Sequence, residues 1–240
     1  MTGGEDGRPP RQLPLALPAE AAFGREDFLV GPSNAEAAEL FDRWPRWPAP
    51  VVLLIGPAGS GKSHLIAAWA GPAGARLIPA GGIAAADPVE AIAAGPVAVE
   101  DLDRHRTAGT DDVALFHLVN AALGGGRLVL SARTPPEAWG IGLPDLASRL
   151  RAAARVSLGE PDDELLRRVL VKLFADRQLA VDPAVIAYAL PRMERSFSGA
   201  NALVDRLDRE GLARHRPITR AIVSDVIAEL ASESGSDTGR

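Results

Sequence analysis

Cysteine is absent from this chain, and lysine is nearly absent, since only Lys62 and Lys172 occur among its 240 residues. The lack of cysteine excludes disulfides and thiolate metal sites, and it fits a reducing compartment, so we expect a cytoplasmic protein. No apolar run approaches the roughly 20 residues that would cross a bilayer. The amino end also lacks the basic start and apolar core of a secretory signal. We therefore expect no membrane partner.

Positive charge is also in deficit. The formal net charge is −5, which argues against a protein that binds duplex DNA through a broad basic surface. Apart from the two lysines and four histidines, every basic side chain is arginine. A lysine retained in such a biased chain indicates a chemical role.

The hydrophobic patterning predicts an α/β protein with two parts. Short apolar runs at residues 51–55 (VVLLI), 75–80, 97–101 (VAVED) and 127–132 (RLVLSA) alternate with helical stretches, which is typical of a doubly wound parallel sheet. After residue 155 the strand signals stop and amphipathic helical patterns follow. We expect a flexible arm at residues 1–25, an α/β domain at 26–158, a small helical lid domain at 159–230 and a polar tail at 231–240.

The segment GPAGSGKS at residues 56–63 matches the phosphate-binding pattern G-x-x-x-x-G-K-[ST] and lies between an apolar strand and a helix, where that pattern functions. Its glycines allow backbone N–H groups to point at phosphate oxygens. Lys62 would bridge the β- and γ-phosphates, and the Ser63 hydroxyl would bind Mg²⁺. The predicted nucleotide-binding residues here are Gly56, Pro57, Ala58, Gly59, Ser60, Gly61, Lys62, Ser63 and the adjoining His64. The alternative is a glycine-rich turn that binds no ligand.

Two acidic residues, Glu100 and Asp101, end the run VAVED. A Mg-nucleotide site needs such an acid at the end of a neighbouring strand. We expect Glu100 to hold Mg²⁺ through water and Asp101 to orient the attacking water, with both counted as metal-site residues. The alternative is that they only begin a solvated loop.

These segments together resemble the AAA+ core of the DnaA replication initiators, and the match of LPDLASRL at residues 143–150 is closer to the Hda-type homologues. The resemblance covers roughly residues 11–230. It implies an AAA+ fold and a bound adenine nucleotide, ADP or ATP with Mg²⁺. It also implies an adenine pocket lined by FLVGPSN at residues 28–34, with Phe28, Val30 and Asn34 as contacts. Arg149 aligns with the arginine finger that points at the nucleotide of a neighbouring protomer.

The chain departs from the family pattern at three positions. Glu100 stands where the family commonly has aspartate, and either Ser131 or Arg133 would sense the γ-phosphate. Ser198 replaces the arginine that the family uses as a second nucleotide sensor. Whether Arg195, about one helical turn away, replaces that arginine is left open. The resemblance therefore implies that this chain binds nucleotide better than it hydrolyses it.

A partner peptide is expected near the amino end. In RQLPLALP at residues 11–18 the two prolines forbid a regular helix and favour an extended backbone. Such a backbone can present Leu13, Leu15 and Leu17 to a groove while Gln12 offers a donor and an acceptor. The alternative is a strand that packs on its own domain. The resemblance favours docking on the DNA sliding clamp, since Hda-type proteins carry a similar peptide there.

The leading hypothesis is a negative regulator of replication initiation, which binds the clamp and inserts Arg149 into DnaA to promote hydrolysis of the ATP bound there. The resemblance implies no recognition helix after residue 230, so direct sequence-specific DNA binding is not expected, and homodimer formation is left open. One alternative is an ATP-hydrolysing loader or remodeller that acts on DNA or a replicative helicase, with Asp101 as its catalytic acid. Another is a clamp adaptor that contributes no catalytic group.

Overall fold

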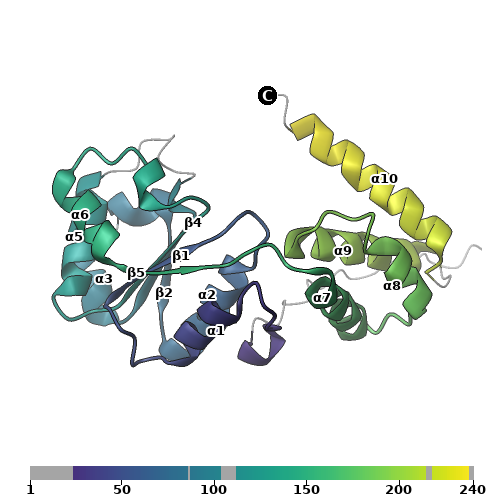
Figure 1. Ribbon diagram of the computed structural model, residues 1–240, viewed down its shortest axis with the longest axis horizontal. Helices are drawn as coiled ribbons and strands as arrows, with labels where there is room; N and C mark the ends of the chain where they lie inside the picture. The colour runs from purple at the N-terminus through teal and green to yellow at the C-terminus, as the bar shows by residue number, and fades with distance from the viewer. Residues whose placement is uncertain (1–23, 86, 104–111, 215–217, 238–240) are drawn as a thin grey trace, which may run out of the picture.

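Five parallel strands form one sheet, in the order β2-β3-β4-β1-β5 (Figure 1). The computed structural model describes residues 24–85, 87–103, 112–214 and 218–237. The strands are β1 (Val51–Ile55), β2 (Arg76–Pro79), β3 (Val97–Glu100), β4 (Leu128–Ala132) and β5 (Ala154–Ser157). The expectation of a parallel α/β domain is confirmed.

Helices connect the strands and then continue without them. In the first part of the chain these are η1 (Arg25–Asp27), α1 (Ala35–Asp42), α2 (Lys62–Ala73), η2 (Ala80–Ala85), α3 (Pro88–Ala94), α5 (Asp112–Leu123), η3 (Pro136–Ala138) and α6 (Pro144–Ala152). The helical part contains α7 (Asp163–Asp176), α8 (Pro183–Ala189), α9 (Phe197–Arg214) and α10 (Arg220–Asp237). Asp162 and Asp182 cap α7 and α8, because their carboxylates accept backbone N–H groups of the first turn.

The central strands are apolar along their whole length because helices cover both faces of the sheet. In β1 the side chains alternate: Val51, Leu53 and Ile55 join the core under α3, α5 and α6, whereas Val52 and Leu54 join the core under α1 and α2. Figure 1 shows the helical part as a separate unit beside this layered domain. Its own core is built from α7, α8, α9 and α10.

Two expectations differ from the structure. The fifth strand, β5, follows α6 and pairs with β1, although no strand was expected after residue 155. Only Val156 of this edge strand is buried, so it lacks the continuous apolar run that identified the other strands. The segment expected to be a polar tail from residue 231 is helical as far as Asp237, where α10 ends.

The sheet topology decides where polar residues meet. The strands run parallel and β1, β4 and β3 are neighbours, so their carboxyl ends lie at one edge of the sheet. The loop after β1, the acids that end β3 and Ser131 of β4 therefore lie side by side.

Candidate functional site

The glycine-rich loop at residues 56–63 joins β1 to α2, as the sequence predicted. Gly59 and Gly61 have φ values of +69° and +92°, in the left-handed region that favours glycine. A Cβ atom at Gly56 would lie 2.5 Å from the carbonyl oxygen of Leu158. Glycine at these positions is therefore required by the fold of the loop as well as by any ligand.

Lys62 begins α2 and is held inside the loop. Its side chain is buried, and its ammonium donates hydrogen bonds to the carbonyl oxygens of Gly56 (2.8 Å) and Pro57 (2.9 Å). Burial lowers the pKa of the Lys62 ammonium, and the nearby Asp101 carboxylate opposes that shift. An ammonium has three donors, so this arrangement leaves one to meet an anion at the loop.

Glu100, Asp101 and Ser63 lie at the same edge. The Ser63 hydroxyl donates a hydrogen bond to the Glu100 carboxylate, while burial raises the pKa of Glu100. The other oxygen, Oε1 of Glu100, is buried without a hydrogen-bond partner among the described residues. Asp101 has a φ of +56°, and its N–H donates to the Ser131 hydroxyl at 3.2 Å. The backbone thus turns directly after β3 and presents both acids at the loop.

This arrangement suits a magnesium ion that a nucleotide shares. The described residues contain no group of three or more His, Cys, Asp or Glu side chains arranged to hold a metal alone. Mg²⁺ in nucleotide sites needs only one or two carboxylates plus phosphate oxygens and water. The Ser63 hydroxyl and the unpartnered Glu100 oxygen fit that requirement.

A cavity of about 680 Å³ opens at the loop and extends between the α/β and helical domains. Several predicted residues line it: Phe28, Ala58, Gly59, Gly61, Lys62, Ser63, His64, Asp101, Arg133 and Ser198. His64 packs edge-to-face on Phe28, with ring centroids 5.4 Å apart. The cavity therefore combines a phosphate-binding loop with an aromatic wall.

Other predicted residues lie nearby without lining this cavity: Val30, Asn34, Gly56, Pro57, Ser60, Glu100 and Ser131. Asn34 is buried and stabilises its own turn, accepting from the Gly31 N–H (2.8 Å) and donating to the Leu29 carbonyl (3.0 Å). Val30 packs against the core under α1 and α2. Ser131 accepts from the Asp101 backbone, so of the two alternatives left open on β4 it is Arg133 that lines the cavity.

Sequence reasoning missed part of the cavity wall, although Leu29 belongs to the segment 28–34 that was expected to line an adenine pocket. The missed residues are Asp27, Val169, Lys172, Leu173, Asp176, Arg177, Phe197 and Asn201. Most of them come from α7 and α9, whose helical patterns show which face is apolar but not what that face meets. The one available signal was Lys172, the second lysine of a chain rich in arginine.

No protein-family model matches the chain. Among solved structures it resembles domain III of the replication initiation protein DnaA from Thermotoga maritima, with a TM-score of 0.73, 16% identity and coverage of 86% of this chain and 96% of that one. The chain has the AAA+ fold. AMPPCP-bound DnaA from Aquifex aeolicus is similar at a TM-score of 0.64 and 19% identity, over 80% of this chain and 68% of that one. A point mutant of RuvB from T. maritima gives a TM-score of 0.66 at 16% identity, over 87% of this chain and 73% of that one.

Within this AAA+ fold the helical domain contacts the phosphate loop directly. The Phe197 N–H donates to the Gly59 carbonyl at 2.9 Å. A Cβ atom at Gly59 would lie 2.3 Å from the Ser198 hydroxyl oxygen. Such close packing explains the serine at position 198, because a long arginine side chain there would have to leave the contact with the loop.

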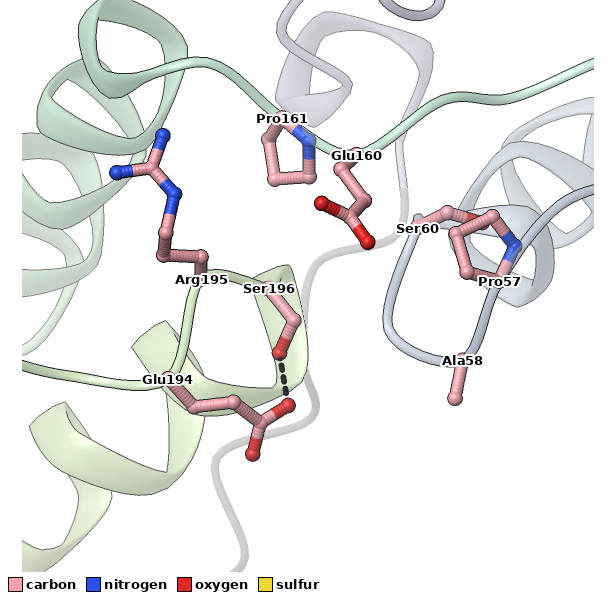
Figure 2. A pocket seen from close by; sticks show the side chains of 8 residues that line it. All are labelled: Pro57, Ala58, Ser60, Glu160, Pro161, Glu194, Arg195 and Ser196. Atoms are coloured by element: carbon pink, nitrogen blue, oxygen red, sulfur yellow. Dashed lines mark hydrogen bonds between the residues drawn. The ribbon is translucent and has the colours of Figure 1, made fainter.

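Arg195 does not line this larger cavity. It lines a smaller hollow of about 240 Å³ together with Glu160, Glu194 and three residues of the phosphate loop, Pro57, Ala58 and Ser60. Figure 2 shows its guanidinium extending away from the phosphate loop, while the Ser196 hydroxyl donates to Glu194 at 2.6 Å. The Arg195 guanidinium pairs with Asp163 at 2.5 Å. Arg195 would therefore have to leave its ion pair with Asp163 to contact a nucleotide at the loop.

Arg149 lies on α6, away from the chain's own cavity. Its side chain is exposed, and its guanidinium lies 5.3 Å from the ring centroid of Phe116 on α5. In Figure 1 α6 lies at the end of the α/β domain farthest from the helical domain. A guanidinium placed there can contact a neighbouring molecule but does not line the cavity of its own chain.

The remaining predicted residues, Gln12, Leu13, Leu15 and Leu17, lie outside the described residues. Among the helices that the structure describes, none has the length and hydropathy needed to cross a membrane.

Replacing Glu100 with glutamine is expected to stabilise the protein at neutral pH. Because the fold raises the pKa of this carboxyl, its contribution to stability falls as pH rises through that raised pKa, and the charged form is unfavourable at pH 7. We expect Glu100→Gln to raise the melting temperature by about 2–4 °C, equivalent to about 1 kcal/mol. Thermal melts at pH 7 and pH 5 test this, and the gain should shrink at the lower pH.

Glu137→Gln is the matched control for that experiment. The pKa of Glu137 is lowered by its hydrogen bond to Arg155, the opposite direction, so removal of its charge should not raise the melting temperature. A lower melting temperature for Glu100→Gln at pH 7 would contradict the conclusion that the charged form of Glu100 is unfavourable in the fold.

Proposed function

We propose that this chain is an adenine-nucleotide-binding regulator that suppresses replication initiation by promoting hydrolysis of DnaA-bound ATP. The observation that carries the proposal is the position of Arg149, exposed on α6 and outside the chain's own cavity. An arginine that served its own nucleotide would line that cavity. An arginine on an outer surface suits insertion into a partner's site.

The nucleotide would bind with its phosphates on residues 56–63 and its nucleoside toward the aromatic wall of Phe28 and His64. Lys62 would neutralise phosphate charge, and Ser63 and Glu100 would hold Mg²⁺, which when bound offsets the charge of the β- and γ-phosphates. The likeness to AMPPCP-bound DnaA supports an adenine nucleotide. The resemblance to the Hda-type homologues of DnaA favours ADP over ATP as the bound nucleotide.

In the proposed reaction Arg149 acts on the partner. Its guanidinium presents several donors in a rigid plane, which suits the three equatorial oxygens of a phosphoryl group in transfer. Charge builds on those oxygens as the bond to the leaving group breaks, so a donor supplied in trans lowers the barrier. The nucleotide in this chain's own cavity would hold the two domains in the arrangement that presents α6.

The decisive experiment measures hydrolysis of DnaA-bound ATP with the sliding clamp loaded on DNA, with and without this chain. We expect the chain to accelerate hydrolysis. If the rate of ATP hydrolysis by DnaA with the clamp is the same with and without this chain, the proposed function is wrong.

The arm carries the second part of the proposal, docking on the clamp through Gln12, Leu13, Leu15 and Leu17. Changing Gln12 and Leu13 to alanine is expected to remove clamp binding, measured by surface plasmon resonance, while leaving the melting temperature and nucleotide binding unchanged. A lower melting temperature would indicate instead that this segment packs on its own domain.

An ATP-hydrolysing loader or remodeller is the second candidate, and Asp101 is the observation that favours it. This carboxylate lines the cavity close to Lys62 and is presented by a left-handed backbone conformation that costs energy in a residue other than glycine. A loader should hydrolyse ATP alone or with DNA, and Asp101→Asn should abolish that activity. The regulator should instead retain its effect on DnaA when Asp101 is changed.

A further inference from the structure

Lys172, the second of the two lysines, lies on α7 in the wall of the cavity. Its ammonium contacts two carboxylates, Oδ1 of Asp27 at 2.6 Å and Oδ2 of Asp176 at 2.9 Å. Asp176 is on the same helix, one turn away. Asp27 belongs to η1, at the amino end of the α/β domain, so this contact joins residues far apart in the sequence.

Each of the two lysines has its own set of charged neighbours. Asp101, Arg133, Asp103 and Glu100 act on Lys62. Asp27 and Asp176 act on Lys172.

His64 belongs with the second set, because Asp27 and Lys172 are the charges that act on it. Phe28, Val169 and Leu173 add apolar surface to the cavity. A nucleotide needs a polar loop for its phosphates and a largely apolar wall for its nucleoside. This cavity offers both, since its wall combines aromatic rings, aliphatic side chains and a few polar groups.

The Asp27 carboxylate is better shielded from water than the carboxylate of a typical surface ion pair, while the two cations compared here are about equally exposed. The side chains are 14% and 27% exposed, compared with 51% and 29% for Glu229 and Arg206 at the same 2.6 Å separation. The hydrogen bond raises the pKa of Lys172 and lowers the pKa of Asp27, so both groups are charged at neutral pH. An exposed pair contributes little, whereas removal of one partner from a shielded pair is costly.

A second polar contact also ties α7 to the amino-terminal segment. The Arg168 guanidinium, which is exposed, donates a hydrogen bond to the Val30 carbonyl at 3.1 Å. The Asp27 carboxylate is itself held in place, since its Oδ2 accepts the Gly24 N–H at 3.2 Å. Lys172 therefore meets a fixed partner on the opposite wall of the cavity.

We propose that Asp27 and Lys172 form a clasp that holds the helical domain against the amino-terminal segment around a bound nucleotide and so sets the rate of nucleotide release. The clasp rests on the proposed nucleotide binding, and it assigns Lys172 a positioning role. Lys62 would hold the phosphates and Lys172 would hold the wall that closes on the nucleoside.

The experiment measures release of radiolabelled ADP from the full chain after dilution into excess unlabelled ADP. Lys172→Met and Asp27→Asn are each expected to release ADP about five- to tenfold faster, the effect of losing one shielded ion pair. The double variant should release ADP no faster than the faster single variant, because the same interaction is lost in each. Lys172→Arg keeps the positive charge, so this variant should release ADP at close to the wild-type rate.

Arg206→Met is the matched control. It breaks the 2.6 Å ion pair with Glu229, which joins α9 to α10 within the helical domain and leaves the cavity untouched. Its release rate should equal that of the wild type. Asp27→Asn keeps the size of the side chain and provides the same test if Lys172→Met does not fold.

The clasp is overturned if both single variants release ADP at the wild-type rate, or if their effects multiply in the double variant. A wild-type chain that retains no ADP would overturn the proposed nucleotide binding itself, and the clasp with it. The two failures are distinguished by whether the wild-type complex forms.

Discussion

Arg149→Ala is expected to reduce hydrolysis of DnaA-bound ATP to the level measured without this chain. Arginine fingers supplied in trans accelerate phosphoryl transfer by about three to five orders of magnitude, so this is the largest effect that we expect from a single substitution. The side chain is exposed, and the described residues place only the Phe116 ring against its guanidinium. Loss of that contact costs about 0.5–1 kcal/mol, so the variant should remain folded and bind nucleotide normally.

Arg151→Ala is the matched control for the finger. Arg151 is an exposed arginine on the same helix, two residues further along, and its loss removes the same charge from a different face of that helix. Stimulation of DnaA should survive this change. Survival of stimulation in Arg149→Ala as well would favour the adaptor, which contributes no catalytic group.

Lys62→Met is expected to weaken nucleotide binding by about two orders of magnitude, the equivalent of about 2.7 kcal/mol. Lys62 is the buried cation at the centre of the loop, and without it the loop itself would offer the phosphates no positively charged side chain. Isothermal titration calorimetry with ADP in the presence of Mg²⁺ measures the loss.

The same substitution should not lower the thermal stability of the ligand-free protein. Burial lowers the pKa of the Lys62 ammonium, so its charge is unfavourable in the fold at neutral pH, and methionine has a similar length without that charge. A loss of affinity accompanied by a large drop in melting temperature would indicate that Lys62 is structural. Unchanged affinity would remove residues 56–63 from the site.

The phosphate loop and the fold class could be predicted because their determinants are local. A buried strand, glycines at fixed spacing and a lysine at the start of a helix specify the loop within a dozen residues. Strands that alternate with helices leave few topologies other than a parallel sheet. The edge strand β5 escaped prediction because it contributes only one buried side chain, Val156.

Side-chain direction was less predictable than position. Phe28 points into the cavity, whereas Asn34, in the same segment, turns inward to hydrogen-bond its own backbone. Both orientations are compatible with the local pattern, and packing against α2 and the helical domain selects between them. Ser131 and Arg133 show the same difference. The Ser131 hydroxyl accepts a hydrogen bond from the Asp101 N–H, whereas Arg133 lines the cavity.

The sequence by itself determined the phosphate loop, the acids that end β3, and the succession of an α/β domain and a helical domain, because each depends on residues close together in the chain. Only the tertiary structure decided which residues of the two domains meet and line the cavity between them. It brought Lys172 to Asp27 and Phe197 to Gly59, and it placed Arg149 outside the cavity. Such contacts depend on how separately patterned surfaces pack, and no local pattern of residues specifies the partner of a surface.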